Sequence, residues 1–255
     1  MNRTLVTLLV VGASLATLRA GIIDNFDSYD SKAEFDAVWT PSTGTGLGLN
    51  TSVFDSSPNS VMNPGTTAQV SRQFMTPISA PILSVSFDFY DFDAGNARDY
   101  VAVQSRVGTE YTGALNNLLA IGKYNSIAGA KYYGRVSTAT GAVYGDGASA
   151  PVSTWFHLDG AANMSIGWHN AKILGLDSTA YVGKVRYEFY IDDVLGGSVD
   201  NLDSVDYNWV LLGSGLSTAP SGLAFDNLAV VPEPSSLALV LLGGFGLFVR
   251  RIRRQ

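Results

Sequence analysis

Residues 21–231 consist of short runs in which apolar and polar side chains alternate. Residues 83–89 alternate Leu, Val and two Phe with Ser, Ser and Asp, and residues 185–191 alternate Val, Tyr, Phe and Ile with Arg, Glu and Tyr. Successive side chains of a strand point to opposite faces, so this period predicts strands with one buried face. A further strand is expected over residues 100–107. Many short strands in succession are typical of an all-β sandwich of two sheets.

One segment interrupts the strand pattern with a helix signal. Ser31 is followed three residues later by Glu34, the spacing of a capping box, which predicts a short helix through about Trp39. Thr40 and Pro41 then end it, because the residue before a proline avoids the helical conformation. Stretches rich in Gly, Ser, Thr and Ala at 42–48 and 141–150 are expected to be loops. The pattern predicts one β-sandwich domain over residues 21–231.

The N-terminus has the composition of a secretory signal peptide. Arg3 is followed by an apolar stretch from Leu5 to Leu18 and then by the small residues Ala20 and Gly21. We expect residues 1–20 to be a signal peptide that is removed on export. Cleavage after Ala16 is an alternative.

The C-terminus combines two prolines, an apolar run and a cluster of arginines. The apolar run over residues 237–249 would form a helix about 20 Å long, against a hydrocarbon core of about 30 Å. Ser235 and Ser236 can extend it, and arginine side chains can reach the lipid surface. The sequence therefore predicts a short C-terminal transmembrane helix in residues 232–255.

This order of elements resembles the PEP-CTERM sorting domain, which exosortase-type membrane proteases recognise in Gram-negative bacteria that make exopolysaccharide. The resemblance implies export, transient anchoring in the inner membrane, processing by an exosortase, and delivery to the cell surface or the extracellular matrix. A plain C-terminal membrane anchor is the alternative. The residues that carry the resemblance are Pro232, Glu233, Pro234, Arg250, Arg251, Arg253 and Arg254.

Charge and composition restrict the function of the body. Removal of both ends would leave ten basic and 21 acidic residues, a formal charge of −11, whereas the whole chain carries −6. A body of this charge repels phosphate backbones, so we expect no nucleic-acid partner. The chain has no cysteine, which excludes disulfides and thiolate ligands.

Two segments of the body resemble concanavalin A-like, laminin-G-like jelly-roll domains. Residues 165–169 (Ser-Ile-Gly-Trp-His) and 187–193 (Tyr-Glu-Phe-Tyr-Ile-Asp-Asp) are similar to the Trp-His strand and the following hairpin of that family. The resemblance implies that Trp168 belongs to the core and that Asp192 and Asp193 begin a turn. Asp193 stands where glycine is usual, so we expect a longer turn. Segments 24–29 and 224–230 resemble the first and last strands of exported jelly-roll domains.

Calcium is the only cofactor that the residues predict, because it binds carboxylate and carbonyl oxygens in loops or between strands. Asp residues also serve as ordinary turn residues, which is the alternative at both places. The first candidate set joins the first and last strands, and the second lies in a loop: Asp24, Asp27 and Asp226, or Asp91, Asp93 and Asn96.

Glycan binding is the leading functional hypothesis, since sugars bind to exposed aromatic faces with polar rims. Tyr132 and Tyr133 must point to opposite faces if they lie in a strand, so at most one of them is in the core. The alternative is that the tyrosines pack strand edges. The candidates lie in or beside loops: Tyr111, Tyr124, Tyr132, Tyr133 and Tyr144.

Catalysis is not expected. Asp91 and Asp93 would lie about 6.6 Å apart on one strand face, within the range of a glycosidase pair, but a polar turn explains them as well. His157 and His169 are the only histidines, and we expect both to be structural. We therefore expect an exported non-catalytic protein associated with exopolysaccharide or other glycans. The alternatives are a structural or adhesive matrix protein and a glycosidase-like enzyme.

Overall fold

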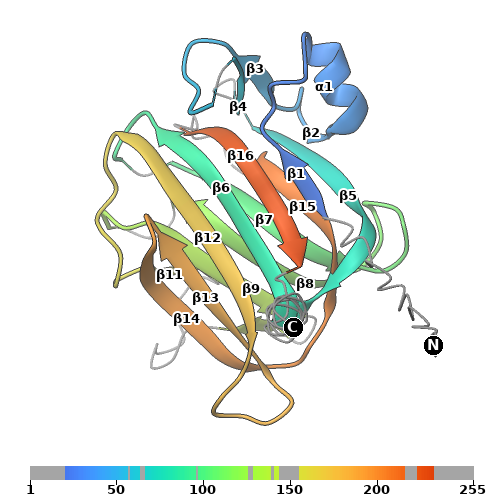
Figure 1. Ribbon diagram of the computed structural model, residues 1–255, viewed down its shortest axis with the longest axis vertical. Helices are drawn as coiled ribbons and strands as arrows, with labels where there is room; N and C mark the ends of the chain where they lie inside the picture. The colour runs from blue at the N-terminus through green and yellow to red at the C-terminus, as the bar shows by residue number, and fades with distance from the viewer. Residues whose placement is uncertain are drawn as a thin grey trace, which may run out of the picture.

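The computed structural model describes residues 21–56, 58–63, 67–95, 97–125, 129–138, 141–143, 155–215 and 223–232. Within these ranges the chain forms two antiparallel sheets that lie face to face (Figure 1). The all-β prediction and the two-sheet sandwich are confirmed. The predicted signal peptide and C-terminal helix lie outside the described residues. No helix in the described ranges is long and apolar enough to cross a membrane.

The first sheet, which we call sheet A, contains both ends of the described chain, because β1 pairs with β16. Its strands follow the order β14-β13-β12-β6-β16-β4-β3. Their bounds are β1 Ile22–Asp24, β3 Gly48–Asn50, β4 Ser60–Met62, β6 Leu83–Asp91, β12 Gly167–Asp177, β13 Val185–Ile191, β14 Val194–Leu202 and β16 Leu223–Pro232.

The second sheet, sheet B, lies behind β12, β6 and β16 in Figure 1. Its order is β10-β9-β8-β7-β15-β5-β2, and β11 also pairs with β9. The bounds are β2 Thr40–Thr43, β5 Ala68–Ser79, β7 Asp99–Arg106, β8 Leu115–Lys123, β9 Tyr133–Thr138, β10 Gly141–Val143, β11 Trp155–His157 and β15 Asp206–Ser214. A 3-10 turn, η1 (Ala80–Ile82), connects β5 to β6.

The two sheets differ in how many faces they bury. In β6 and β13 of sheet A, buried and partly exposed residues alternate strictly, as the sequence predicted. In β7, β8 and β15 of sheet B, nearly every residue is buried. One face of sheet B packs against sheet A, and the other face is covered by a second hydrophobic cluster. Sheet B therefore has a buried outer face that alternation alone does not predict.

The predicted helix is α1 (Lys32–Val38), and its cap forms as expected on one side. The Ser31 hydroxyl accepts a hydrogen bond from the Glu34 amide at 3.3 Å. The Glu34 carboxylate accepts from the Asp30 amide at 2.8 Å, one residue earlier than the capping box requires.

The β13–β14 hairpin and its neighbour β12 correct two expectations. Ile191 pairs with Val194, so the turn contains only Asp192 and Asp193 and is not lengthened. Both residues have positive φ, 50° and 60°, as a type I′ turn requires. Trp168 is half-buried on the outer face of sheet A opposite Tyr90, not in the core, because its neighbour His169 takes the inward position of β12.

Asp193 is a position where the hairpin can be stabilised. Glycine has no steric cost at positive φ, so Asp193→Gly should raise the free energy of unfolding by about 0.5–1 kcal/mol. The exposed ion pair of Asp193 with Lys172 contributes little against this gain. Urea unfolding measures the change. Asp193→Ala, which keeps the strain, is the control, and equal stability of the two variants would contradict the prediction.

Candidate functional site

Alternation at two points of sheet B places tyrosines on its outer face. Tyr132 joins the core between the sheets and Tyr133 joins the outer cluster, as adjacent residues of an extended chain must. At the end of β8, Lys123 is buried inside the sandwich and Tyr124 packs on the outside. Tyr124 and Tyr133 of the outer face therefore each follow a polar residue that points inward.

The outer cluster runs across β11, β9, β8, β7 and β15. Small and aliphatic residues from the middle strands form its floor, and aromatic rings stand on both sides. We call this surface the aromatic face. Its buried members are Tyr100, Ala102, Leu118, Ala120, Tyr133, Trp155, Trp209 and Leu211, with Tyr111 and Tyr124 partly exposed.

One half of the aromatic face is centred on Trp155. The Tyr124 ring stacks on it with centroids 4.8 Å apart and 17° between the planes. Tyr100 contacts the same indole at 5.0 Å, and Tyr133 packs edge-on against Tyr124 at 6.1 Å. These rings fix one another, so their positions are set before any ligand arrives.

The other half is centred on Trp209, which packs edge-on against Tyr111 at 5.5 Å. The Arg106 guanidinium lies 4.3 Å from the centroid of the Tyr111 ring. Its Nε donates to the side-chain oxygen of Gln104 at 2.6 Å, and one terminal nitrogen donates to the carbonyl of Gly113 at 2.8 Å. The guanidinium is therefore held in a fixed plane.

Two more arginines lie over rings of the first half. The Arg98 guanidinium is 4.6 Å from the centroid of Tyr124, and that of Arg135 is 5.7 Å from Trp155. Burial lowers the pKa of Arg135, and the positive charge of Arg98 lowers it further. The aromatic face thus gathers guanidinium groups, whose fixed donors suit hydroxyl and carboxylate oxygens.

A cavity adjoins the aromatic face beside Arg106. Its volume is about 460 Å³. Its walls come from β5, β7, β8, β15 and the loop before β15: Pro77, Ser105, Arg106, Asn116, Val205, Asp206 and Asn208.

The structure brings together three of the five predicted tyrosines. Tyr111, Tyr124 and Tyr133 share the aromatic face, whereas Tyr132 is in the core and Tyr144 lies outside the described residues. The sequence reasoning missed the tryptophans and arginines of the face. The signal was the alternation of Tyr, Arg and Ser with Gly and Val in residues 133–137, which marks an outward row in a strand.

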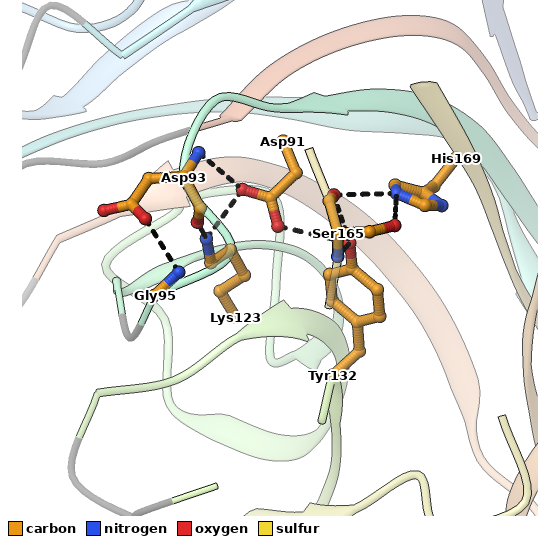
Figure 2. A network of polar contacts seen from close by, with 7 residues as sticks. All are labelled: Asp91, Asp93, Gly95, Lys123, Tyr132, Ser165 and His169. Carbon is orange, nitrogen blue, oxygen red and sulfur yellow. Dashed lines mark hydrogen bonds and ion pairs between the residues drawn. The ribbon is translucent and has the colours of Figure 1, made fainter. Parts of the chain in front are cut away.

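The inward groups meet in a polar network between the sheets (Figure 2). The Lys123 ammonium donates to Asp91 at 2.7 Å, and both side chains are fully buried. It also donates to the Asp93 carbonyl. Tyr132 donates its hydroxyl to the other Asp91 oxygen at 3.1 Å. Because Asp91 is in β6 and Lys123 in β8, this ion pair joins the two sheets.

Asp91 and Asp93 do not form the predicted pair. Asp91 is buried against Lys123, whereas Asp93 is exposed and donates its amide to Asp91 at 3.1 Å, an Asx turn. The two carboxylates therefore do not share a surface across which a sugar bond could lie. Asn96, the third member of this predicted calcium set, lies outside the described residues.

The members of the other predicted calcium set have separate protein donors. Asp24 accepts from the Phe26 amide, the Tyr29 hydroxyl, the Trp39 indole and Arg72, at 2.7–2.9 Å. Asp27 and Asp226 accept from other groups: Asn25 and Asn59 for Asp27, and the amides of Asp55, Ser56 and Asn227 for Asp226. The described residues contain no group of three acidic, histidine or cysteine side chains placed to hold a metal ion.

His169 connects a serine and an aspartate in the order of a catalytic triad. Its Nδ1 is 2.8 Å from Asp192, and its Nε2 is 3.1 Å from the Ser165 hydroxyl. The same Nε2 is 2.9 Å from the Ser165 carbonyl, which only accepts. A nitrogen that donates to this carbonyl has no lone pair for a serine proton, so the geometry fits a link between a loop and a hairpin better than a general base.

The fold places the chain among jelly-roll sandwiches of the galectin and concanavalin type. It is similar to the T. cruzi calreticulin globular domain, with a TM-score of 0.52 at 12% identity over 91% of this chain and 95% of that one. The metal-free Emp46p carbohydrate recognition domain gives 0.48 at 9% identity, over 84% and 97%. The cellulose induced protein Cip1 gives 0.49 at 14%, over 82% and 96%.

The C-terminal sequence matches a known family model. Residues 230–254 match the PEP-CTERM protein-sorting motif, so the chain carries this motif, as its prolines and arginines predicted. The motif indicates an exported protein that is sorted through the membrane by an exosortase. No curated protein matches the chain in sequence.

The buried ion pair generates a prediction with a defined pH dependence. Burial raises the pKa of Asp91, and Lys123 lowers it. Lys123→Met should therefore raise that pKa further and leave a buried charge at neutral pH, at a cost of about 3–5 kcal/mol. The variant should be most stable in acid, with Asp91 protonated, and lose stability as pH rises through the folded-state pKa.

Urea unfolding at pH 4 and pH 7 measures this effect. Lys184→Met, which removes the exposed pair with Asp203, is the matched control and should change stability by no more than about 1 kcal/mol. A Lys123→Met variant with the same deficit at both pH values would contradict the assignment.

Proposed function

We propose that this is an exported, non-catalytic surface or matrix protein that binds extracellular polysaccharide with the aromatic face of sheet B. The observation that carries the proposal is the order in which side chains are stacked on that face. Buried rings support half-exposed tyrosines, and arginine guanidiniums lie over the tyrosines. This gives planar donors and ring surfaces on one rigid sheet, which is what hydroxyl-rich sugar rings require.

Preorganisation supports the proposal further. Arg106 is anchored by Gln104 and Gly113, and Tyr111 donates its hydroxyl to Gln69 at 3.2 Å. Side chains that are already ordered lose little entropy when a ligand binds. The sorting motif places the protein on an export route, where polysaccharide is a ligand that a surface protein can meet.

A second candidate function follows from the burial of the rings. Trp155 and Trp209 are only 3% and 8% exposed, so the outer cluster also serves as a second core. If that were its whole role, the protein would act as a structural or adhesive matrix component. It would then be retained at the surface without any dependence on saccharide.

Removal of a supporting ring distinguishes the two functions. Tyr111→Ala and Tyr124→Ala should each lower polysaccharide affinity about tenfold, because the arginines above them lose their fixed position. Affinity electrophoresis of the full-length chain in detergent, through gels that contain the producing cell's own matrix polysaccharide, measures the effect. Tyr181→Ala, an exposed tyrosine in the β12–β13 loop, is the control. Equal retardation of all three variants would exclude the aromatic face.

The sorting motif generates a separate prediction about the mature protein. The predicted C-terminal helix, about 20 Å long, is short for a permanent span, so we expect the tail to be cut near Pro232, Glu233 and Pro234. Mass spectrometry of surface-located protein should find no peptide from residues 237–255. Replacement of all three residues by alanine should retain the tail, and an intact C-terminus on the native surface protein would contradict the proposal.

A further inference from the structure

We propose that the aromatic face selects acidic polysaccharides, whose carboxylate or sulfate groups pair with Arg106 and Arg135. The inference rests on the proposed function and adds the class of glycan. It comes from the distribution of charge between the two outer faces of the sandwich. The body is strongly acidic, yet three of its five arginines lie on the aromatic face: Arg98, Arg106 and Arg135.

On the outer face of sheet A, cations have carboxylate partners. Arg186 pairs with Glu188 at 2.9 Å and lies 3.7 Å from Asp200. Lys172 pairs with Asp193 at 2.9 Å. These positive charges are already neutralised by the protein itself.

The arginines of the aromatic face have partners of another kind. Arg106 donates to a side-chain amide oxygen and a backbone carbonyl, and it lies over a tyrosine ring. Arg135 lies over Trp155, and its buried Nε has no hydrogen-bond partner. These contacts orient the two guanidiniums and leave their positive charge uncompensated by the described carboxylates.

Acidic residues are scarce in the described strands of sheet B. Asp99 is on the inward side of β7, with Val101 and Val103. Asp206 stands at the first residue of β15 and accepts from Ser79. Across the centre of the face the outward residues are rings, leucines, small residues, glutamine and arginines.

A partly buried guanidinium has lost part of its hydration, and without an anionic partner no ion pair offsets the free-energy cost of that loss. A carboxylate or sulfate of the ligand would restore it through paired N–H donors, and such charge-assisted bonds are about twice as strong as neutral ones. The overall negative charge of the body does not prevent this, since it is screened beyond about 8 Å at physiological ionic strength. The contacts at the face therefore decide the selectivity.

The test compares polygalacturonate with the same polymer after its carboxyl groups have been reduced to alcohols. Dextran sulfate and neutral dextran form a second pair of probes. Affinity electrophoresis of the full-length chain in detergent should show retardation by polygalacturonate, by dextran sulfate or by both, and at least tenfold weaker binding to the matched neutral polymers. The acidic arms identify whether carboxylate or sulfate is the preferred group.

Two variants test whether the acidic polymer binds at the aromatic face. Arg135→Gln and Arg106→Gln should each lower affinity for the acidic polymer about tenfold, whereas Arg186→Gln on sheet A should not. Thermal unfolding checks that the variants are folded. Equal binding to the acidic and reduced polymers would overturn the inference and leave the proposed function standing. Acidic-polymer binding that is unchanged in both variants would overturn the inference as well. No binding to any polysaccharide would overturn both.

Discussion

The carboxylate of Asp91 is the group on which the geometry of the site depends. It lies between the sheets and accepts from two inward side chains, the ammonium of Lys123 at the end of β8 and the hydroxyl of Tyr132 just before β9. Because neighbouring residues in a strand point to opposite faces, Tyr124 and Tyr133 must then point outward. A one-residue slip of β8 or β9 would place these rings in the core and leave Asp91 without its partners. One buried charge inside the sandwich thus determines which residues form its outer surface.

A buried ion pair is a weak source of stability, since the loss of hydration offsets most of the attraction. Its value here is in specificity. Strands β7, β8 and β15 are buried on both faces. Their register is therefore not fixed by the usual difference between a solvent-exposed face and a buried face. The ion pair of Lys123 with Asp91 of the facing sheet supplies a fixed point for this register. The hydrogen bond from Tyr132, the residue before β9, adds a second point of attachment.

The sequence predicted those parts of the structure that depend on local patterns. Strands β6 and β13 and helix α1 follow from alternation and capping. The sandwich itself follows from many such strands. The hairpin turn was placed correctly but expected to be too long, because Asp at positive φ is less common than Gly. Trp168 was assigned to the core by resemblance, but its position in β12 directs it outward. The aromatic face depends on contacts between rings far apart in the chain, from Tyr100 to Trp209, and local patterns do not contain them.

The body is acidic as a whole and yet carries a face with several arginines, because the outer faces of its two sheets differ in which groups surround their cations. On sheet A, the outward Lys172 and Arg186 have carboxylate partners, so their positive charges are neutralised by the protein itself. On sheet B, rings occupy the positions where such acids would stand, and the arginines lie over the rings. Aromatic packing therefore both closes the outer face against water and keeps carboxylates away from the guanidiniums. Because aromatic residues occupy outward positions of sheet B, its strands β7, β8 and β15 show no alternation of apolar and polar residues. For the same reason Arg106 and Arg135 have no carboxylate partner in the described part of the chain, and the charge of this face is opposite in sign to that of the whole chain.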